Sequence, residues 1–372
     1  MSRLVAIAAA LCDSVGGRDW DAALVAAAIQ ALHEELKEEP RAGQESSARD
    51  PRALEAAQAL LVSRLARSRV QDADGVAMVA LTAGSLVEHG APAEALGEVL
   101  LAQLPEVLRA ARRYADRCAS GPTPPHPVGD DDPIVAQIDG IEIGAARFRA
   151  HLERDPGGGA ALAYLSEWAL PTIAALSRSR ALLTRAAGDA QLRALVAALA
   201  ESRAGWLHTL LGVQLGAPWL VLLPELGRGF RTRVDGVTSN WDLHALLADA
   251  LIPLGVPGRA NPRAAMAILR GEPLACERDF IEGSWELYDH RAAPHFGVEP
   301  PMIPEEFSVP GEGRPADIPD FEGERVLLLG AARLERSWSM GRPFEALRAD
   351  VEVLEELAPA EVRAALVRLG AS

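Results

Sequence analysis

Local signals for a strand, a turn and a helix follow one another in the segment Phe230-Arg-Thr-Arg-Val-Asp-Gly-Val-Thr-Ser-Asn-Trp-Asp-Leu-His-Ala-Leu-Leu-Ala-Asp-Ala-Leu251. Its first residues alternate between apolar and polar side chains, as in a strand, and Asp235-Gly236 is a common two-residue hairpin turn. Ser239, followed three residues later by Asp242, is typical of a helix start, and leucines at helical spacing come next. The segment therefore predicts a strand, a turn and an amphipathic helix.

The same order of signals occurs once earlier in the chain. Two short apolar runs within 134–143 flank Asp139-Gly140, and the helix that follows has Phe148 and Leu152 one turn apart. Three glycines at 157–159 are expected to break the chain. Helices then resume from about 160 to 212, with an interruption near Gly188-Asp189.

Further strands are expected on both sides of the opening segment. The compact apolar runs 219–223 and 325–329 predict buried strands. A helix is expected over 345–356, although 351–354 alternates as a strand would, and a last helix is expected over 359–369. The second half is therefore mixed α and β, with too few strands for a full doubly wound sheet.

Residues 3–117 predict a succession of helices separated by short loops, rich in Ala and Leu. No fixed repeat length is present, so a helical bundle and an irregular helical array both remain open. The expected helices, after an opening one at the N-terminus, span about 19–39, 52–69, 74–89 and 93–118.

The best candidate for a linker is the stretch 119–133, which contains five prolines, two glycines and three consecutive aspartates. We therefore predict a helical domain over 1–118, the linker over 119–133 and an α+β domain over 134–372. The predicted fold class is mainly α with an α+β C-terminal region, which combines helices with short hairpins and a small sheet.

The composition narrows the class of protein. The 372 residues are 49% hydrophobic but only 5% aromatic, and the net charge is -15. Such an acidic surface repels nucleic-acid phosphates, and no long basic run opposes it, so nucleic-acid binding is disfavoured. No apolar run approaches the roughly 20 residues of a membrane span. A soluble protein that binds a protein partner or a small molecule is expected.

The cysteines favour a reducing compartment. Cys12, Cys118 and Cys276 are far apart and odd in number, which argues against a disulfide framework or a thiolate zinc site. The apolar run Leu4–Leu11 is short and lacks a good cleavage site, so an opening helix is favoured over a signal peptide. We expect a cytoplasmic protein.

One imidazole and one carboxylate in the segment 230–251 are candidates for catalysis. His244 could act as a general base oriented by Asp242, and Trp241 lies one turn away as a surface for a ligand. The alternative, which the sequence favours, is that His244 packs on Trp241 as a buried, hydrogen-bonded imidazole.

A second candidate cluster lies at 285–295. Trp285 and Tyr288 are candidates for ligand binding, and His290 is a further candidate for catalysis. The acidic and histidine side chains around them match no zinc spacing, so no metal site is predicted. A third cluster contributes Arg336, which could hold a carboxylate or phosphate, and Trp338 as a stacking surface.

No motif in the chain identifies a reaction or a cofactor. The phosphate-binding patterns GxGxxG and GxxxxGK[ST] and the serine-hydrolase pattern GxSxG are all missing. The leading interpretation is an intracellular interaction or scaffold protein. The alternative is an enzyme or small-ligand-binding protein with its site in the C-terminal region. A deep pocket that gathers the candidate residues would favour this alternative, whereas their dispersal through a closed core would favour the scaffold.

Overall fold

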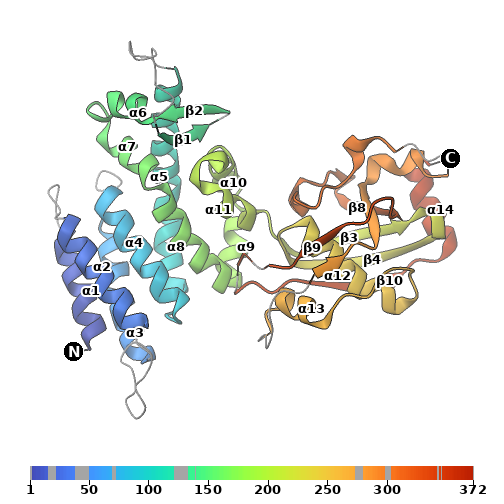
Figure 1. Cartoon of the computed structure of the whole chain (residues 1–372), viewed down its shortest axis with the longest axis horizontal. Coiled ribbons are helices and arrows are strands. Elements are labelled where there is room, and N and C mark those ends of the chain that lie inside the picture. The colour runs from blue at the N-terminus through green and yellow to red at the C-terminus, as the bar shows by residue number, and fades with distance from the viewer. Residues whose placement is uncertain are drawn as a thin grey trace. The chain divides into compact units, whose positions relative to one another are not determined.

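The computed structural model describes residues 2–15, 22–37, 50–68, 73–120, 133–138, 140–272, 280–297, 303–341, 343–344 and 346–371. The chain forms two compact units, Met1–Leu211 and Gly212–Ser372. The first unit is mainly helical and the second combines helices with a mixed sheet, which confirms the predicted fold class (Figure 1).

The first unit is a succession of helices that includes one small hairpin. Helix α4 packs against α8, and α5 packs against α7 and α8. The α4–α8 approach is close, because a Cβ atom at Gly84 would lie 2.6 Å from Pro171. The elements of this unit are α1 (Arg3–Ser14), α2 (Ala22–Lys37), α3 (Pro51–Ala66), α4 (Ala73–Glu88), α5 (Glu94–Ser120), β1 (Ile134–Ile138), β2 (Ile141–Gly144), α6 (Ala145–Leu152), α7 (Pro156–Ala163), α8 (Leu165–Arg178), α9 (Arg180–Gly188), α10 (Ala190–Ala197), the π-helical turn η3 (Ala200–Ala204) and α11 (Gly205–Leu211).

The division into compact units differs from the domain boundary that the sequence suggests. Residues 134–211, which we grouped with the C-terminal region, belong to the first unit because α7 and α8 pack on α5 and α4. Composition identifies a stretch that is unlike a helix, but only side-chain packing determines on which partner the later helices lie. Most of the linker expected at 119–133 lies outside the described residues.

The second unit is built on a mixed sheet with the strand order β10-β4-β3-β8-β6, to which β7 adds on β8. Within it β3 and β8 are parallel and the other pairs are antiparallel. Its elements are β3 (Gln214–Leu223), η4 (Pro224–Leu226), β4 (Arg228–Val237), α12 (Asn240–Leu251), η5 (Ile252–Leu254), α13 (Arg263–Arg270), β5 (Phe280–Glu282), β6 (Trp285–Asp289), η6 (His290–His295), η7 (Glu305–Phe307), η8 (Pro315–Asp317), β7 (Asp320–Phe321), β8 (Glu324–Ala331), β9 (Ser337–Ser339), β10 (Asp350–Glu356) and α14 (Pro359–Arg368).

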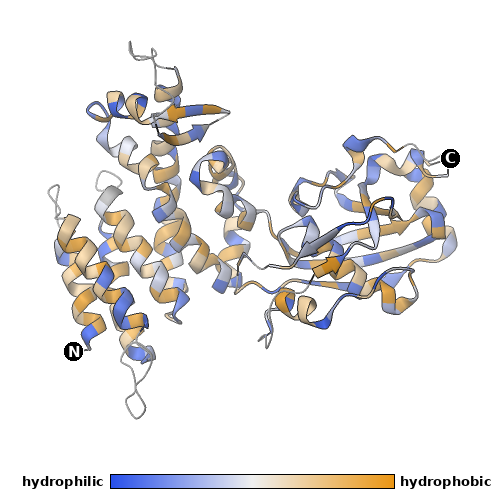
Figure 2. Ribbon diagram, viewed as in Figure 1, coloured by the Kyte–Doolittle hydropathy of each residue, from blue (hydrophilic) through white to orange (hydrophobic). Residues whose placement is uncertain are grey.

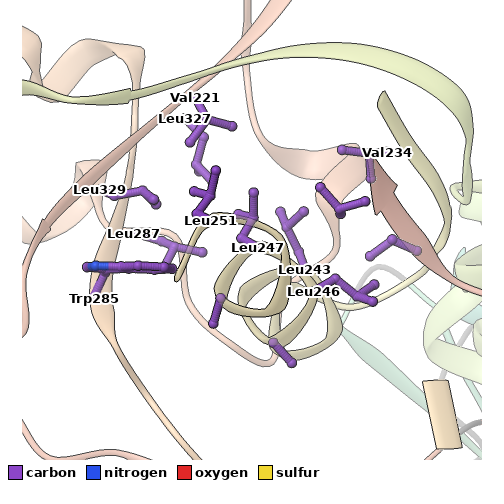
Figure 3. Close-up of a cluster of buried hydrophobic side chains, with 14 of the residues drawn as sticks. Val221, Val234, Leu243, Leu246, Leu247, Leu251, Trp285, Leu287, Leu327 and Leu329 are labelled. Carbon is purple, nitrogen blue, oxygen red and sulfur yellow. The ribbon is translucent and has the colours of Figure 1, made fainter. Parts of the chain in front are cut away.

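Both faces of this sheet are covered where β3 and β8 pair, which explains why residues 219–223 and 326–329 are apolar at every position. Side chains of one face, such as Val221 and Leu327, pack on the leucines of α12 (Figure 3). Those of the other face, such as Leu220 and Val326, form a second core with α14 and η6. The hydropathy colouring shows orange and blue segments interleaved on the strands of this unit as well as on the helices (Figure 2).

The hairpin turn expected at Asp235-Gly236 is wrong. Strand β4 continues through both residues, and the connection from β3 to β4 is the turn 224–227. Gly236 has φ +67°, and a Cβ there would lie 1.7 Å from the carbonyl oxygen of Arg348. The glycine therefore serves a close backbone approach beside an irregularity in the β3–β4 register rather than a turn.

The glycines at 157–159 do not break the chain, because they lie inside α7. The Asp155 side chain caps this helix by accepting from the Gly158 amide at 2.9 Å. A Cβ at Gly159 would lie 2.5 Å from Leu152 and 3.3 Å from Tyr114, so the small residue allows the helix to approach its neighbours.

The prediction of a helix over 345–356 is also wrong, and the alternative prediction of a strand at 351–354 is confirmed. Residues 350–356 form β10, which pairs with β4 at the edge of the sheet. Its acidic side chains pair with arginines of β4, as Glu352 does with Arg233 and Glu355 with Arg231. These long-range pairs favour the strand although glutamate and leucine favour helix locally.

Several other expectations are confirmed. Strands β1 and β2 pair as a hairpin, with Ile138 opposite Ile141; Asp139 of the predicted turn lies outside the described residues. The final helix α14 and the helix α12 at the end of the segment 230–251 form where expected. None of the helices in the described part of the chain is both long and apolar enough to cross a membrane.

Candidate ligand-binding site

A groove of about 760 Å³ lies at one end of the sheet of the second unit. The parallel strands β3 and β8 both reach it with their carboxyl ends, at Leu223 and Leu329, and β6 begins there with Trp285. Ligands of open sheets commonly bind beyond the carboxyl ends of parallel strands, where the chain changes direction. This groove is the candidate site.

The groove has an apolar floor and partly exposed apolar sides. Leu223, Leu329 and Trp285 are buried beneath it. By contrast, Leu226 is 47% exposed and Leu334 is 64% exposed, although both are large apolar residues. The volume lies in the range of roughly 300–1,000 Å³ that is usual for small-molecule sites.

Charged side chains surround this apolar surface. Arg259 forms ion pairs with Glu282 and, at 3.8 Å, with Glu335. Arg336 lies 2.8 Å from the buried carboxylate of Glu286. Two further charged residues line the groove: Glu225 and Arg333.

His244 lies in the core and not in the groove lining. Its Nε2 atom accepts hydrogen bonds from the backbone amides of Ser284, at 3.0 Å, and Trp285, at 3.4 Å. Its ring lies parallel to Trp285 and also contacts Trp338. Burial, together with the charge of Arg336, lowers the pKa of His244 to about 4. The neutral ring therefore accepts hydrogen bonds from the backbone amides at the start of β6, and its predicted catalytic role stays a prediction.

Asp242 is likewise part of a helix start. Its amide donates to the Ser239 hydroxyl at 3.1 Å, so Ser239 caps α12 as the spacing predicted. The residue is 6% exposed. Burial raises the pKa of Asp242 to about 6, and the hydrogen bond with Ser239 opposes this rise. No contact between Asp242 and His244 is present in the described hydrogen bonds, so the expected orientation of one by the other is not formed.

Trp241 and Trp338 stack on each other beside His244, with ring centroids 4.4 Å apart. Gly311 lies against Trp241 so closely that a Cβ there would be 2.2 Å from the ring. The indole of Trp338 donates to the sulfur of Met340 at 3.2 Å. These rings fill a core, and neither lines the groove.

Tyr288 and His290 belong to the opposite side of the sheet. Tyr288 packs edge-on against Phe296 in the second core, and the His290 ring contacts Phe321 at 5.3 Å. Of the eight residues predicted to act in catalysis or binding, the groove therefore gathers Trp285 and Arg336.

Sequence reasoning missed most of the groove. Leu226, Leu334 and Arg259 carry no local pattern, because an exposed leucine or an isolated arginine is common on any surface. Glu286 stood out only as a type of metal ligand, whereas it pairs with Arg336. Within the described ranges, no three His, Cys, Asp or Glu side chains lie where they could hold a metal ion together.

Comparison of the chain with protein-family models, with curated proteins and with solved structures gives no match. Similarity to a known protein therefore assigns no function to the fold or to the groove, and the geometry of the groove is what points to a function.

Proposed function

We propose that this chain is a cytoplasmic binding protein rather than an enzyme, and that its C-terminal unit holds a small ligand in the groove at the carboxyl ends of β3 and β8. The observation that carries the proposal is the separation of the groove from the titratable core residues. Trp285 and Arg336 line the groove, whereas His244 and Asp242 are buried in structural hydrogen bonds. Among the described lining residues there is no histidine or cysteine that could serve as a base or a nucleophile.

The test is a screen of small polar and apolar fragments by ligand-observed NMR on the full chain. Ala332 lines the groove, so Ala332→Trp fills it, and Ala360→Trp places the same bulk on the exposed surface of α14. Fragments that bind the parent should bind Ala360→Trp equally and lose binding to Ala332→Trp. Fragments that bind both variants alike would contradict the proposal, and turnover of a bound fragment would favour the enzyme.

A second function, contact with a protein partner, is supported by one feature of the first unit. Trp206 on α11 is 62% exposed, and Leu170 on the neighbouring α8 is 49% exposed. Exposed tryptophans are common anchors of protein interfaces. In this proposal Trp206→Ala removes a partner that the parent retains from cell extract, while Leu354→Ala in the second unit does not. Retention by Trp206→Ala would refute it.

The compartment is part of the same proposal. The two described cysteines, Cys12 and Cys118, are free thiols, and burial raises the pKa of both. Such thiols are unreactive and suit a reducing environment.

A further inference from the structure

We propose that the groove selects small molecules that carry a single carboxylate on an apolar body, and that Arg336 binds the carboxylate. This inference rests on the proposed ligand-binding function and adds the chemical class of the ligand. Three features support it: the pairing of Arg336, the charges around the groove and the exposed leucines.

Arg336 is held in place from behind. Its Nη2 atom lies 2.8 Å from Oε2 of Glu286, whose side chain is 7% exposed, while the arginine side chain is 35% exposed. Glu286 is its one ion-pair partner in the described part of the chain. A guanidinium has five N–H donors in a fixed plane, and a carboxylate bound to Nη2 on one side leaves the second two-donor side of the group for a ligand. A carboxylate matches two such donors at once.

The remaining charges exclude more highly charged ligands. Apart from Arg336, three glutamates (positions 225, 282 and 335) and two arginines (positions 259 and 333) line the groove, so the rest of the lining has a net charge of -1, and the whole chain has a net charge of -15. Arg259 is already paired with two of these glutamates. A phosphate or a dicarboxylate would bring its second charge close to this acidic surface, whereas a single carboxylate at Arg336 would not.

The apolar surface determines the rest of the ligand. Leu226 and Leu334 are exposed to solvent, and Trp285 and Leu329 lie beneath them. An apolar body placed here would remove both leucines from water. The volume of about 760 Å³ accommodates a small molecule, and we therefore assign a small amphipathic acid rather than a peptide.

Three probes of equal length test the charge preference: octanoate, octan-1-ol and octylamine, measured on the full chain by ligand-observed NMR at pH 7.5. Octanoate should bind at least about 10-fold more tightly than the other two, as expected for a charge-assisted pair of hydrogen bonds. Arg336→Lys, which keeps the charge but loses the planar pair of donors, should reduce this preference several-fold.

Removal of Arg336 alone leaves Glu286 buried without a partner and can unfold the unit. The double variant Glu286→Gln/Arg336→Gln avoids this, because it replaces the ion pair by two neutral amides. It should bind all three probes with similar affinity. The matched control is Arg233→Gln, which breaks the Arg233–Glu352 pair on β4 and β10 away from the groove and should leave the preference unchanged.

A pair of leucines tests where the apolar body lies. Leu334 and Leu354 are both exposed, at 64% and 52%, but Leu334 lines the groove and Leu354 lies on β10. Leu334→Ala should lower the affinity for all three probes by a similar factor of about 3 to 10, while Leu354→Ala should leave the affinity for each probe unchanged.

Several outcomes would overturn the proposal. Equal binding of octanol and octanoate to the parent, or an unchanged preference in the double variant, removes Arg336 as the carboxylate anchor. A leucine-terminated tripeptide that binds 10-fold more tightly than octanoate would favour a peptide carboxyl terminus instead. If neutral fragments bind in the groove and octanoate is not preferred, only this inference fails. If no fragment loses binding to the Ala332→Trp variant, both this inference and the proposed ligand-binding function fail.

Discussion

Replacing His244 by alanine tests whether this imidazole is a structural group of the core. Its Nε2 atom accepts hydrogen bonds from two backbone amides, those of Ser284 and Trp285, and its ring packs on Trp285 and Trp338. An unsatisfied buried amide costs about 1–3 kcal/mol, and a lost aromatic contact costs about 0.5–1.5 kcal/mol. We therefore expect His244→Ala to lower the free energy of unfolding by roughly 2–4 kcal/mol at pH 7.5.

The same variant should show a distinctive dependence on pH. The pKa of His244 is about 4 in the folded protein, below its usual 6.5. Between these values the unfolded chain binds a proton that the folded chain does not, so the parent loses stability as the pH falls from 6.5 towards 4. The loss reaches roughly 3 kcal/mol. The alanine variant lacks this term, so its deficit relative to the parent should shrink steadily below pH 6.5.

Urea denaturation followed by tryptophan fluorescence measures both effects. Ser239→Ala is the control, because loss of the α12 cap should cost about 1 kcal/mol at every pH in this range. His244→Gln keeps a hydrogen-bond acceptor and should recover part of the loss. If His244→Ala is less destabilising than Ser239→Ala, or its deficit does not change between pH 7.5 and 4.5, the structural role assigned to His244 is refuted.

Three further predictions concern other parts of the chain. The pKa of Asp242 is about 6 in the folded protein instead of 3.8, so its burial lowers the stability of the fold increasingly as the pH rises from about 4 to 6. Asp242→Asn should therefore raise the free energy of unfolding by up to roughly 3 kcal/mol at pH 7.5 and by little at pH 4, and equal gains at the two pH values would contradict this. Protease cleavage within 119–133 should leave two fragments that co-elute in size-exclusion chromatography, because α7 and α8 pack on α5 and α4; separate elution would refute that packing. Micromolar binding to duplex DNA at physiological salt would contradict the prediction from a net charge of -15 that the chain does not bind nucleic acid.

The local signals that predicted helices succeeded where the competing forces were also local. The cap of α12 depends on Ser239 and the amide three residues later, so a short window contains all the participants. The apolar runs of β3 and β8 predicted buried strands because a strand covered on both faces has no polar side to show.

Predictions from short stretches of sequence were wrong where contacts with distant residues determined the local structure. Gly236 resembles a turn residue, but its conformation serves an approach to Arg348, more than a hundred positions away in sequence. The residues of β10 favour a helix by themselves, and cross-strand pairs with β4 make them a strand. The glycines of α7 favour a break, and packing against Tyr114 keeps them helical.

The candidate site depended on tertiary structure almost entirely. Trp285 and Arg336 were recognisable from the sequence as groups that bind ligands, because aromatic rings and guanidinium groups do so chemically in many settings. That these two line a groove while Trp241, His244 and Trp338 fill a core follows from the packing of α12, which carries Trp241 and His244, on the sheet and from the pairing of β5 with β9. The sequence by itself determined the kinds of groups available and the helices and central strands that carry them. Only the register of strands far apart in the chain decided which groups face solvent together, because that register depends on contacts that no local pattern records.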